Sequence, residues 1–210
     1  MRHYALSFVA SLLLMTGCTN TTKAPAHFCA KPIDNELSLD SLPDGAMAAG
    51  FSADDINWRG GNITLTVYTP YQYLAADVSR LQTGDTLLYE GDKPLPIDSI
   101  ERRDKYVIIN GGIEAGGAEL TPVDATTYRA TTMDDHSVYK KLGTCNVVLA
   151  QDFTVVDCGT EPTDPSDTIR SAQKPYFDGL KDYRRQFSPL DTRVTIKRGV
   201  VTEINRHWIP

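Results

Sequence analysis

The segment 133–140, MDDHSVYK, combines the residue types of a reactive site. It places Asp134, Asp135, His136 and Ser137 side by side, which together supply the carboxylate, imidazole and hydroxyl groups of a nucleophilic triad. Successive residues on a strand point to opposite faces, however, and a nucleophile needs its base within about 3 Å, usually from a separate element. We therefore predict a polar loop, with no metal site and no cofactor. The alternative is an extracytoplasmic hydrolase that uses Asp135 and His136 with a distant third group.

The segment 110–117, NGGIEAGG, is the second feature that could do chemistry, because glycine-rich loops hold phosphate groups. Its glycines lack the GxGxxG or GxxxxGK[ST] spacing that aims successive amides at phosphates. Tight turns or a bulge are the better interpretation. The sequence also lacks HExxH, CxxC, GxSxG and EF-hand spacing. It therefore favours a binding protein over an enzyme.

Three tyrosines, Tyr68, Tyr71 and Tyr73, gather around Pro70 at the end of a predicted strand. If one ring is left partly exposed there, it could stack on a sugar or pack on a partner protein. We name these tyrosines as candidate ligand-binding residues. The alternative is that their rings pack in the core.

The amino-terminal residues predict export from the cytoplasm. The apolar run Ala5–Met15 has 11 residues, so at 1.5 Å per residue it spans only about half of a hydrocarbon core roughly 30 Å thick. Arg2 precedes this run and Gly17 follows it, as in a secretory signal peptide. The stretch Met15-Thr16-Gly17-Cys18 resembles the bacterial lipobox.

This resemblance implies that residues 1–17 are removed as a signal peptide and that the Cys18 thiol carries diacylglycerol, often with a further acyl chain such as palmitate at the new amino terminus. Such chains anchor a protein to a membrane without a transmembrane helix. The expected location is the bacterial cell envelope. Thr19 after the lipidated cysteine implies the outer membrane, on its periplasmic or surface face, in a Gram-negative organism; otherwise the outer face of the cytoplasmic membrane is expected.

The charge balance narrows the class of partner. The chain has 21 basic and 27 acidic residues and a sequence pI near 5.2, so it has no long-range attraction for a phosphate backbone. We therefore expect no nucleic-acid partner. The expected partners are the membrane, through the lipid anchor, and an envelope protein or glycan.

The composition divides the mature chain into a tether and one domain. Residues 18–45 are rich in Thr, Pro, Asp and Ser and have little periodic apolar pattern, which predicts a lipidated flexible tether. Residues 46–210 predict a single β-rich domain. In NITLTVY, at 62–68, apolar and polar residues alternate as in a half-buried strand, and further short apolar runs bounded by turn residues follow at intervals of about ten residues.

These runs predict a mainly β fold, an antiparallel sandwich or small barrel, with α+β as the alternative. One amphipathic helix is predicted at about 175–187, because Tyr176, Leu180, Tyr183 and Phe187 recur at helical spacing. Alternation on both sides of a glycine turn predicts a terminal hairpin at about 192–206.

The cysteines allow at most one internal disulfide if Cys18 is acylated. A hairpin centred on 151–152 would place Cys145 opposite Cys158, so we predict that these two form a disulfide. The main rival is a disulfide from Cys29 to either of them.

Overall fold

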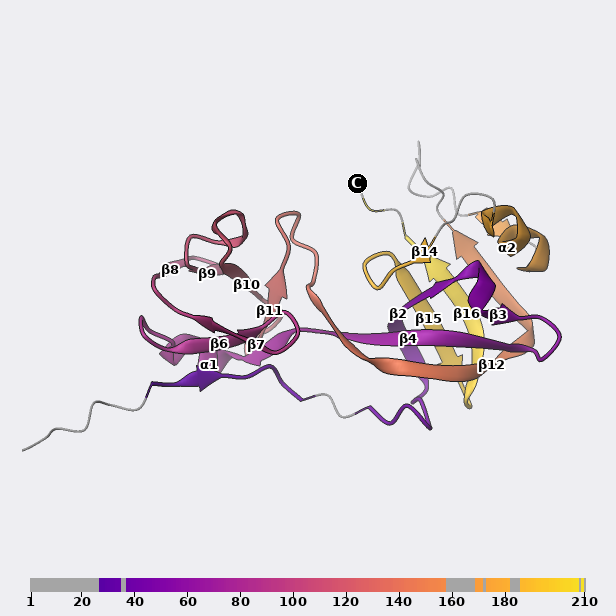
Figure 1. Cartoon of the computed structure of the whole chain (residues 1–210), viewed down its shortest axis with the longest axis horizontal. Helices are drawn as coiled ribbons and strands as arrows, with labels where there is room; N and C mark the ends of the chain where they lie inside the picture. Colours follow the sequence, from indigo (N-terminus) through magenta and orange to yellow (C-terminus); the bar gives the residue numbers. More distant parts are fainter. Residues whose placement is uncertain are drawn as a thin grey trace, which may run out of the picture.

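The computed structural model describes residues 27–34, 37–157, 169–171, 173–181, 186–207 and 209. Its strands form two lobes that lie side by side along the long axis of the molecule (Figure 1). The mainly β fold predicted from the sequence is confirmed. Cys18, Cys158 and Tyr183 lie outside the described residues. No helix in the described part of the chain is long and apolar enough to span a membrane.

The first lobe is a barrel whose strands come from both ends of the described chain. Its strands are β2 (Gly45–Ser52), β4 (Asn62–Pro70), β12 (Tyr139–Asp157), β15 (Thr192–Lys197) and β16 (Val200–Arg206). Its shorter elements are η1 (Ala53–Asp55), β3 (Ile56–Asn57), β13 (Ile169–Ser171), α2 (Gln173–Lys181) and β14 (Gln186–Phe187). The β15–β16 pair is the antiparallel terminal hairpin that the sequence predicts.

The long strand β12 closes this barrel. Its first half pairs antiparallel with β4, and from Val148 onward it pairs parallel with β16. The remaining contacts complete the circle β2-β4-β12-β16-β15-β2. With α2 between β12 and β15, this is the connectivity of an OB-type barrel.

The course of β12 corrects one prediction. The predicted hairpin centred on 151–152 is wrong, because residues 139–157 form one continuous strand. Cys145 pairs with Leu65 of β4, whereas Asp157, which precedes Cys158, pairs with Arg206 at the far end of the strand. The register argument for a Cys145–Cys158 disulfide therefore fails, and both described cysteines, Cys29 and Cys145, are free thiols.

The barrel core follows from the alternation in its strands and from one helix. Ile63, Leu65 and Val67 of β4 point inward and are fully buried. Phe177 of α2 is also fully buried and covers the end of this core, with its ring 5.8 Å from that of Phe187. The other buried members are Leu42, Ala49, Phe51, Ala53, Ile56, Val147, Leu149, Phe153, Val155, Val194, Ile196, Val201 and Ile204.

The predicted helix at 175–187 is correct in place but not in extent. The described helix α2 covers Gln173–Lys181, and Phe187 belongs to β14, where it pairs with Phe51 of β2. The two rings stack with their centroids 4.2 Å apart. Phe187 is therefore held by a cross-strand partner, which helical spacing cannot reveal.

The second lobe is an insertion, residues 71–138, between barrel strands β4 and β12, and we call it the inserted lobe. Its elements are β5 (Gln72–Leu74), α1 (Ala75–Arg80), β6 (Thr86–Tyr89), β7 (Lys93–Pro96), β8 (Ile100–Arg103), β9 (Tyr106–Ile109), η2 (Ile113–Ala115), β10 (Ala118–Pro122) and β11 (Thr127–Thr131). They form a five-stranded sheet in the order β5-β11-β10-β9-β8 and a smaller sheet in which β6 pairs with β7.

The inserted lobe has a hydrophobic core of its own. Its buried members are Ala30, Tyr71, Tyr73, Val78, Leu81, Leu87, Tyr89, Ile97, Val107, Ile109, Ala118, Leu120 and Ala130. The described residues of 46–210, for which the sequence predicts one domain, thus contain two cores. The two lobes are joined covalently by the paired strands β4 and β12.

The segment that the sequence predicts as a tether contributes to both cores. Cys29–Ala30 form strand β1, which pairs parallel with β6. Ala30 is fully buried in the inserted lobe, and Leu42 is buried in the barrel. Within the described residues, 27–34 and 37–44 thus belong to the folded structure, because a few apolar side chains in a polar stretch find buried positions.

Candidate functional site

The alternative catalytic pair lies in a turn after β11. Asp135 has a positive φ of 57°, and its carboxylate accepts a hydrogen bond from Arg129 at 3.0 Å. Arg129 also donates to the Ser137 hydroxyl at 3.2 Å. The buried Nε2 of His136 has no hydrogen-bond partner among the described residues. The carboxylate, imidazole and hydroxyl are thus adjacent in sequence but are not linked as a triad.

The described residues contain no group of three or more His, Cys, Asp or Glu side chains placed to hold a metal ion. Arg129 forms an ion pair with Asp135, one of the two acidic side chains of the 133–140 segment. This geometry suits a structural turn.

The candidate ligand-binding tyrosines do not form a common surface. Tyr71 and Tyr73 are 1% and 0% exposed and belong to the core of the inserted lobe, while Tyr68 is half-buried on β4. The Tyr73 hydroxyl donates to the carbonyl of Leu88 at 2.7 Å, and burial raises the pKa of Tyr73 far above its usual value. Neither Tyr71 nor Tyr73 is therefore available to stack on a ligand.

The Tyr71 hydroxyl instead fixes the turn between β6 and β7. It accepts hydrogen bonds from the backbone N–H groups of Gly91 at 2.6 Å and Asp92 at 3.2 Å. The Asp92 carboxylate pairs with Lys140 at the start of β12, 2.7 Å away, and this hydrogen bond raises the pKa of Lys140. These contacts tie the inserted lobe to the strands that carry it.

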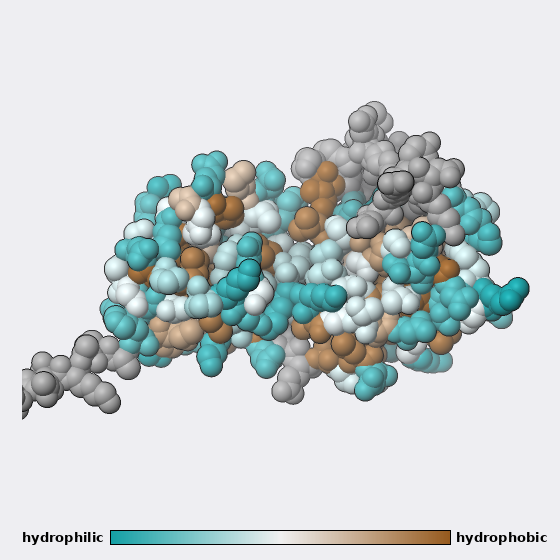
Figure 2. Space-filling model, viewed as in Figure 1, coloured by the Kyte–Doolittle hydropathy of each residue, from teal (hydrophilic) through white to brown (hydrophobic). Residues whose placement is uncertain are grey.

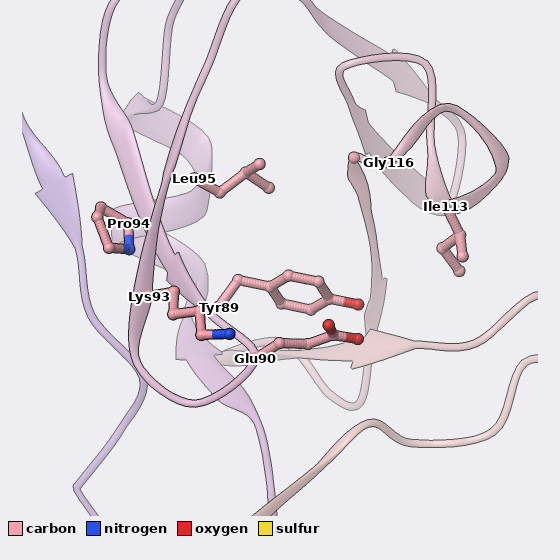
Figure 3. A pocket seen from close by; sticks show the side chains of 8 residues that line it. Tyr89, Glu90, Lys93, Pro94, Leu95, Ile113 and Gly116 are labelled. Carbon is pink, nitrogen blue, oxygen red and sulfur yellow. The ribbon is translucent and has the colours of Figure 1, made fainter.

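Three of the hollows formed by the described residues, each of about 270–300 Å³, lie on the inserted lobe. The first, of about 280 Å³, lies between the β6–β7 turn and the η2 loop (Figure 3). In it the Tyr89 hydroxyl and the Glu90 carboxylate point toward the loop that carries Ile113. Burial raises the pKa of Tyr89 to about 12, so its hydroxyl stays neutral and can donate a hydrogen bond at physiological pH.

The other two hollows share Arg103 and Tyr106 at the β8–β9 end of the five-stranded sheet. One lies on the outward face with Glu119, and the other extends round the sheet edge to Val78 of α1. Tyr106 is 43% exposed, and Met133, which lines one of the two hollows, is 63% exposed. We call the outward face formed by Arg103, Tyr106, Ile108, Glu119 and Met133 the β8–β11 surface. Strand pairing places these side chains next to one another, since Arg103 lies opposite Tyr106 and Ile108 lies opposite Glu119.

The β8–β11 surface and its surroundings carry charges of both signs. Arg103 donates to the Glu101 carboxylate at 2.6 Å, and this hydrogen bond lowers the pKa of Glu101. Glu119 lies in the middle of the same face. Figure 2 shows hydrophobic residues as small separate areas among hydrophilic ones on both lobes. A partner would therefore meet an exposed aromatic ring and a thioether surrounded by charges of both signs.

The outward face of β4 and β12 is of a different kind. Thr66 lies opposite Thr144 and Thr64 lies opposite Asn146, all directed away from the barrel core. OB-type barrels bind oligonucleotides and oligosaccharides on the corresponding face. Single-stranded nucleic acids are held there by aromatic rings and positive charges. These four positions provide only hydroxyl and amide groups.

Sequence reasoning missed Tyr106 and Met133. The alternation in YVIIN, at 106–110, carries the signal for Tyr106, because burial of Val107 and Ile109 requires Tyr106 and Ile108 to point outward. Nothing in the sequence marks Met133, whose position depends on the turn that returns the chain to β12.

No protein family, no characterised protein and no solved structure matches this chain.

Proposed function

We propose that this protein is a lipid-anchored binding or scaffolding protein of the bacterial cell envelope, and that its inserted lobe contacts a partner protein through the β8–β11 surface. The observation that carries the proposal is the exposure of Tyr106 and Met133, which line one hollow on the outward side of the five-stranded sheet. Tyr, Met and Arg are enriched in protein interfaces, where large side chains anchor the contact.

The size and charge of the hollows support a protein as the occupant. Each hollow is at or below the lower end of the range for pockets that enclose a small ligand, about 300–1,000 Å³. A mixed set of charges around an apolar centre resembles the polar rim and apolar core of an interface. The anchor is supported by the lipobox-like residues 15–18 and the short apolar run before them.

Site-specific photo-crosslinking in intact cells tests the proposed contact. A photoreactive amino acid at Asp134, which is exposed beside Met133, should give a discrete crosslinked protein, whereas the same group at Thr64 on the barrel should not. Adding Tyr106→Ala should abolish the Asp134 product, because it removes the largest exposed ring of the surface. The matched control is Val123→Ser, which changes another exposed apolar side chain of the inserted lobe and should leave the product intact.

Two results would contradict the proposal. An Asp134 product of undiminished yield in the Tyr106→Ala variant would show that the β8–β11 surface does not make the contact. Tyr106-dependent binding to purified cell-wall glycan, with no protein product, would assign the surface to a glycan. The anchor is tested separately by the mass of the mature amino-terminal peptide, which should carry acyl chains on Cys18 and lose them in Cys18→Ser.

A further inference from the structure

The segment that leads to the anchor is part of the inserted lobe. Phe28 donates its backbone N–H to the Asp85 carboxylate at 2.8 Å, and its carbonyl accepts from the N–H of Thr86 at 2.9 Å. The Arg80 guanidinium lies over the Phe28 ring, 4.0 Å from its centroid. Together with the burial of Ala30, these contacts hold Phe28 and the edge strand β1 (Cys29–Ala30) on the smaller sheet.

The inserted lobe needs this strand to satisfy the hydrogen bonds of a buried carboxyl group. Asp85 is 2% exposed, and its carboxylate accepts from the backbone N–H groups of Phe28 and Gln82. If the strand detached, one carboxylate oxygen would lose its donor and the site of Ala30 would open. A buried polar group without its partner costs free energy, so attachment is favoured over release.

The chain then crosses to the barrel before the first barrel strand begins. Ile33 donates its N–H to the carbonyl of Gln72 at 2.6 Å, still within the inserted lobe. Leu39 next packs so closely on Gly143 of β12 that a Cβ at position 143 would lie 2.4 Å from the Leu39 methyl. The order along the chain is therefore inserted lobe first, barrel second.

We infer that the inserted lobe is the membrane-proximal part of the protein and that the barrel is its distal part; this inference rests on the proposed lipid anchor. The nine residues from 19 to 27 can span at most about 32 Å. A free tether over the whole of 18–44 would reach about 95 Å and would allow either lobe to lie next to the membrane. Docking of residues 28–33 shortens the reach to about a third and ties it to one lobe.

The same arrangement separates the anchor from the β8–β11 surface. Strand β1 pairs with β6 in the smaller sheet, whereas β8, β9 and β10 belong to the five-stranded sheet, drawn above β6 and β7 in Figure 1. A partner that binds Tyr106 and Met133 therefore contacts the five-stranded sheet, whereas the anchored strand belongs to the smaller sheet. The proposed partner contact and the membrane attachment thus use different sheets of one lobe.

Energy transfer to the bilayer surface tests this orientation in the full acylated protein. A donor dye is attached through an azide-bearing amino acid at Thr83, exposed near β1, or at Asp152, exposed on the barrel. Acceptor dye is carried by lipid headgroups in vesicles of bacterial phospholipid. Transfer should be clearly higher from position 83 than from position 152, and Phe28→Ser combined with Ala30→Ser should reduce or abolish the difference.

Lys31→Ser is the matched control, because Lys31 is exposed on the same segment, and it should preserve the difference. Equal transfer from the two positions, or higher transfer from 152, in protein that carries the acyl mass would overturn the orientation and leave the anchor intact. Absence of the acyl mass would overturn the anchor and the orientation together. The comparison of positions 83 and 152 in the unaltered background decides the question even if the double variant fails to fold.

Discussion

Arg206 and Asp157 form a buried, two-point ion pair where the parallel strands β16 and β12 lie side by side. The guanidinium donates from Nε at 3.1 Å and from Nη2 at 2.8 Å to the two carboxylate oxygens, and each side chain is only 6% exposed. Tyr176 of α2 donates to the same carboxylate, and the guanidinium lies 5.4 Å from the Phe187 ring centroid. One ion pair thus connects two barrel strands, the helix and β14.

Removing one partner of this ion pair should destabilise the barrel strongly. Asp157→Ala removes the carboxylate that accepts from the buried Arg206 guanidinium and from Tyr176, and breaking a buried ion pair typically costs about 3–5 kcal/mol. Urea unfolding monitored by tryptophan fluorescence measures this loss. The control is Asp178→Ala, which removes the exposed i,i+4 pair with Lys174 and should cost less than about 0.5 kcal/mol. Equal effects of the two substitutions would show that the buried pair does not hold the strands together.

The two buried tyrosines of the inserted lobe should contribute to stability in proportion to the hydrogen bonds that they make. Tyr71→Phe removes the acceptor of two backbone N–H groups in the β6–β7 turn and should cost roughly 1–3 kcal/mol. Tyr73→Phe removes one hydrogen bond, to the Leu88 carbonyl, and should cost about 1 kcal/mol. Denaturant unfolding of both variants gives the comparison. A larger loss for Tyr73→Phe would contradict the assigned role of the Tyr71 hydroxyl.

The alternation of apolar and polar residues is enough to predict where strands lie, but not which strands pair with each other. Ile63, Leu65 and Val67 alternate with polar residues and are buried as expected, and the terminal hairpin follows from the same pattern. Over 145–158, however, the alternation of a hairpin and that of one long strand look alike. The outcome depends on β4 and β16, which are distant in sequence and give β12 a partner along each half.

In the described residues, the predicted tether and the predicted exposure of the tyrosines are wrong for a related reason. Phe28 and Ala30 stand in a stretch rich in Thr and Pro, and only the edge of β6 makes that stretch a strand. Tyr71 and Tyr73 were candidates for exposure because they end a strand, yet the chain enters the inserted lobe at this point and buries both. In each case the deciding contact is with a residue that sequence spacing does not identify.

The glycine-rich segment 110–117 contains two adjacent glycines that are required for different reasons. A Cβ at Gly117 would lie 1.9 Å from the backbone oxygen of Ile109, a clash that only a backbone shift relieves. Gly116 has a φ of 80° with open space beside it, so alanine there pays only the left-handed backbone cost of about 1–2 kcal/mol. Gly117→Ala should therefore lower the thermal unfolding midpoint more than Gly116→Ala. The reverse order would refute the close approach of Gly117 to Ile109.

Cys145 should be a free thiol that reacts slowly with alkylating agents. It is half-buried on β12, and burial raises the pKa of its thiol above the usual value. A raised pKa leaves less thiolate at any given pH below it, and only the thiolate reacts with alkylating agents. The native protein should therefore be alkylated at Cys145 more slowly than N-acetylcysteine at pH 8. The alkylation rate of Cys145 should also continue to rise with pH beyond the point at which the rate of N-acetylcysteine levels off.

After unfolding without a reductant, Cys145 should be alkylated fully, as measured by peptide mass spectrometry. A crosslinked peptide that joins Cys145 to Cys158 or Cys29 would contradict the free thiol. A bond to Cys158 would also contradict the single strand β12, which keeps Cys145 beside Leu65 and about 40 Å of extended chain from Asp157.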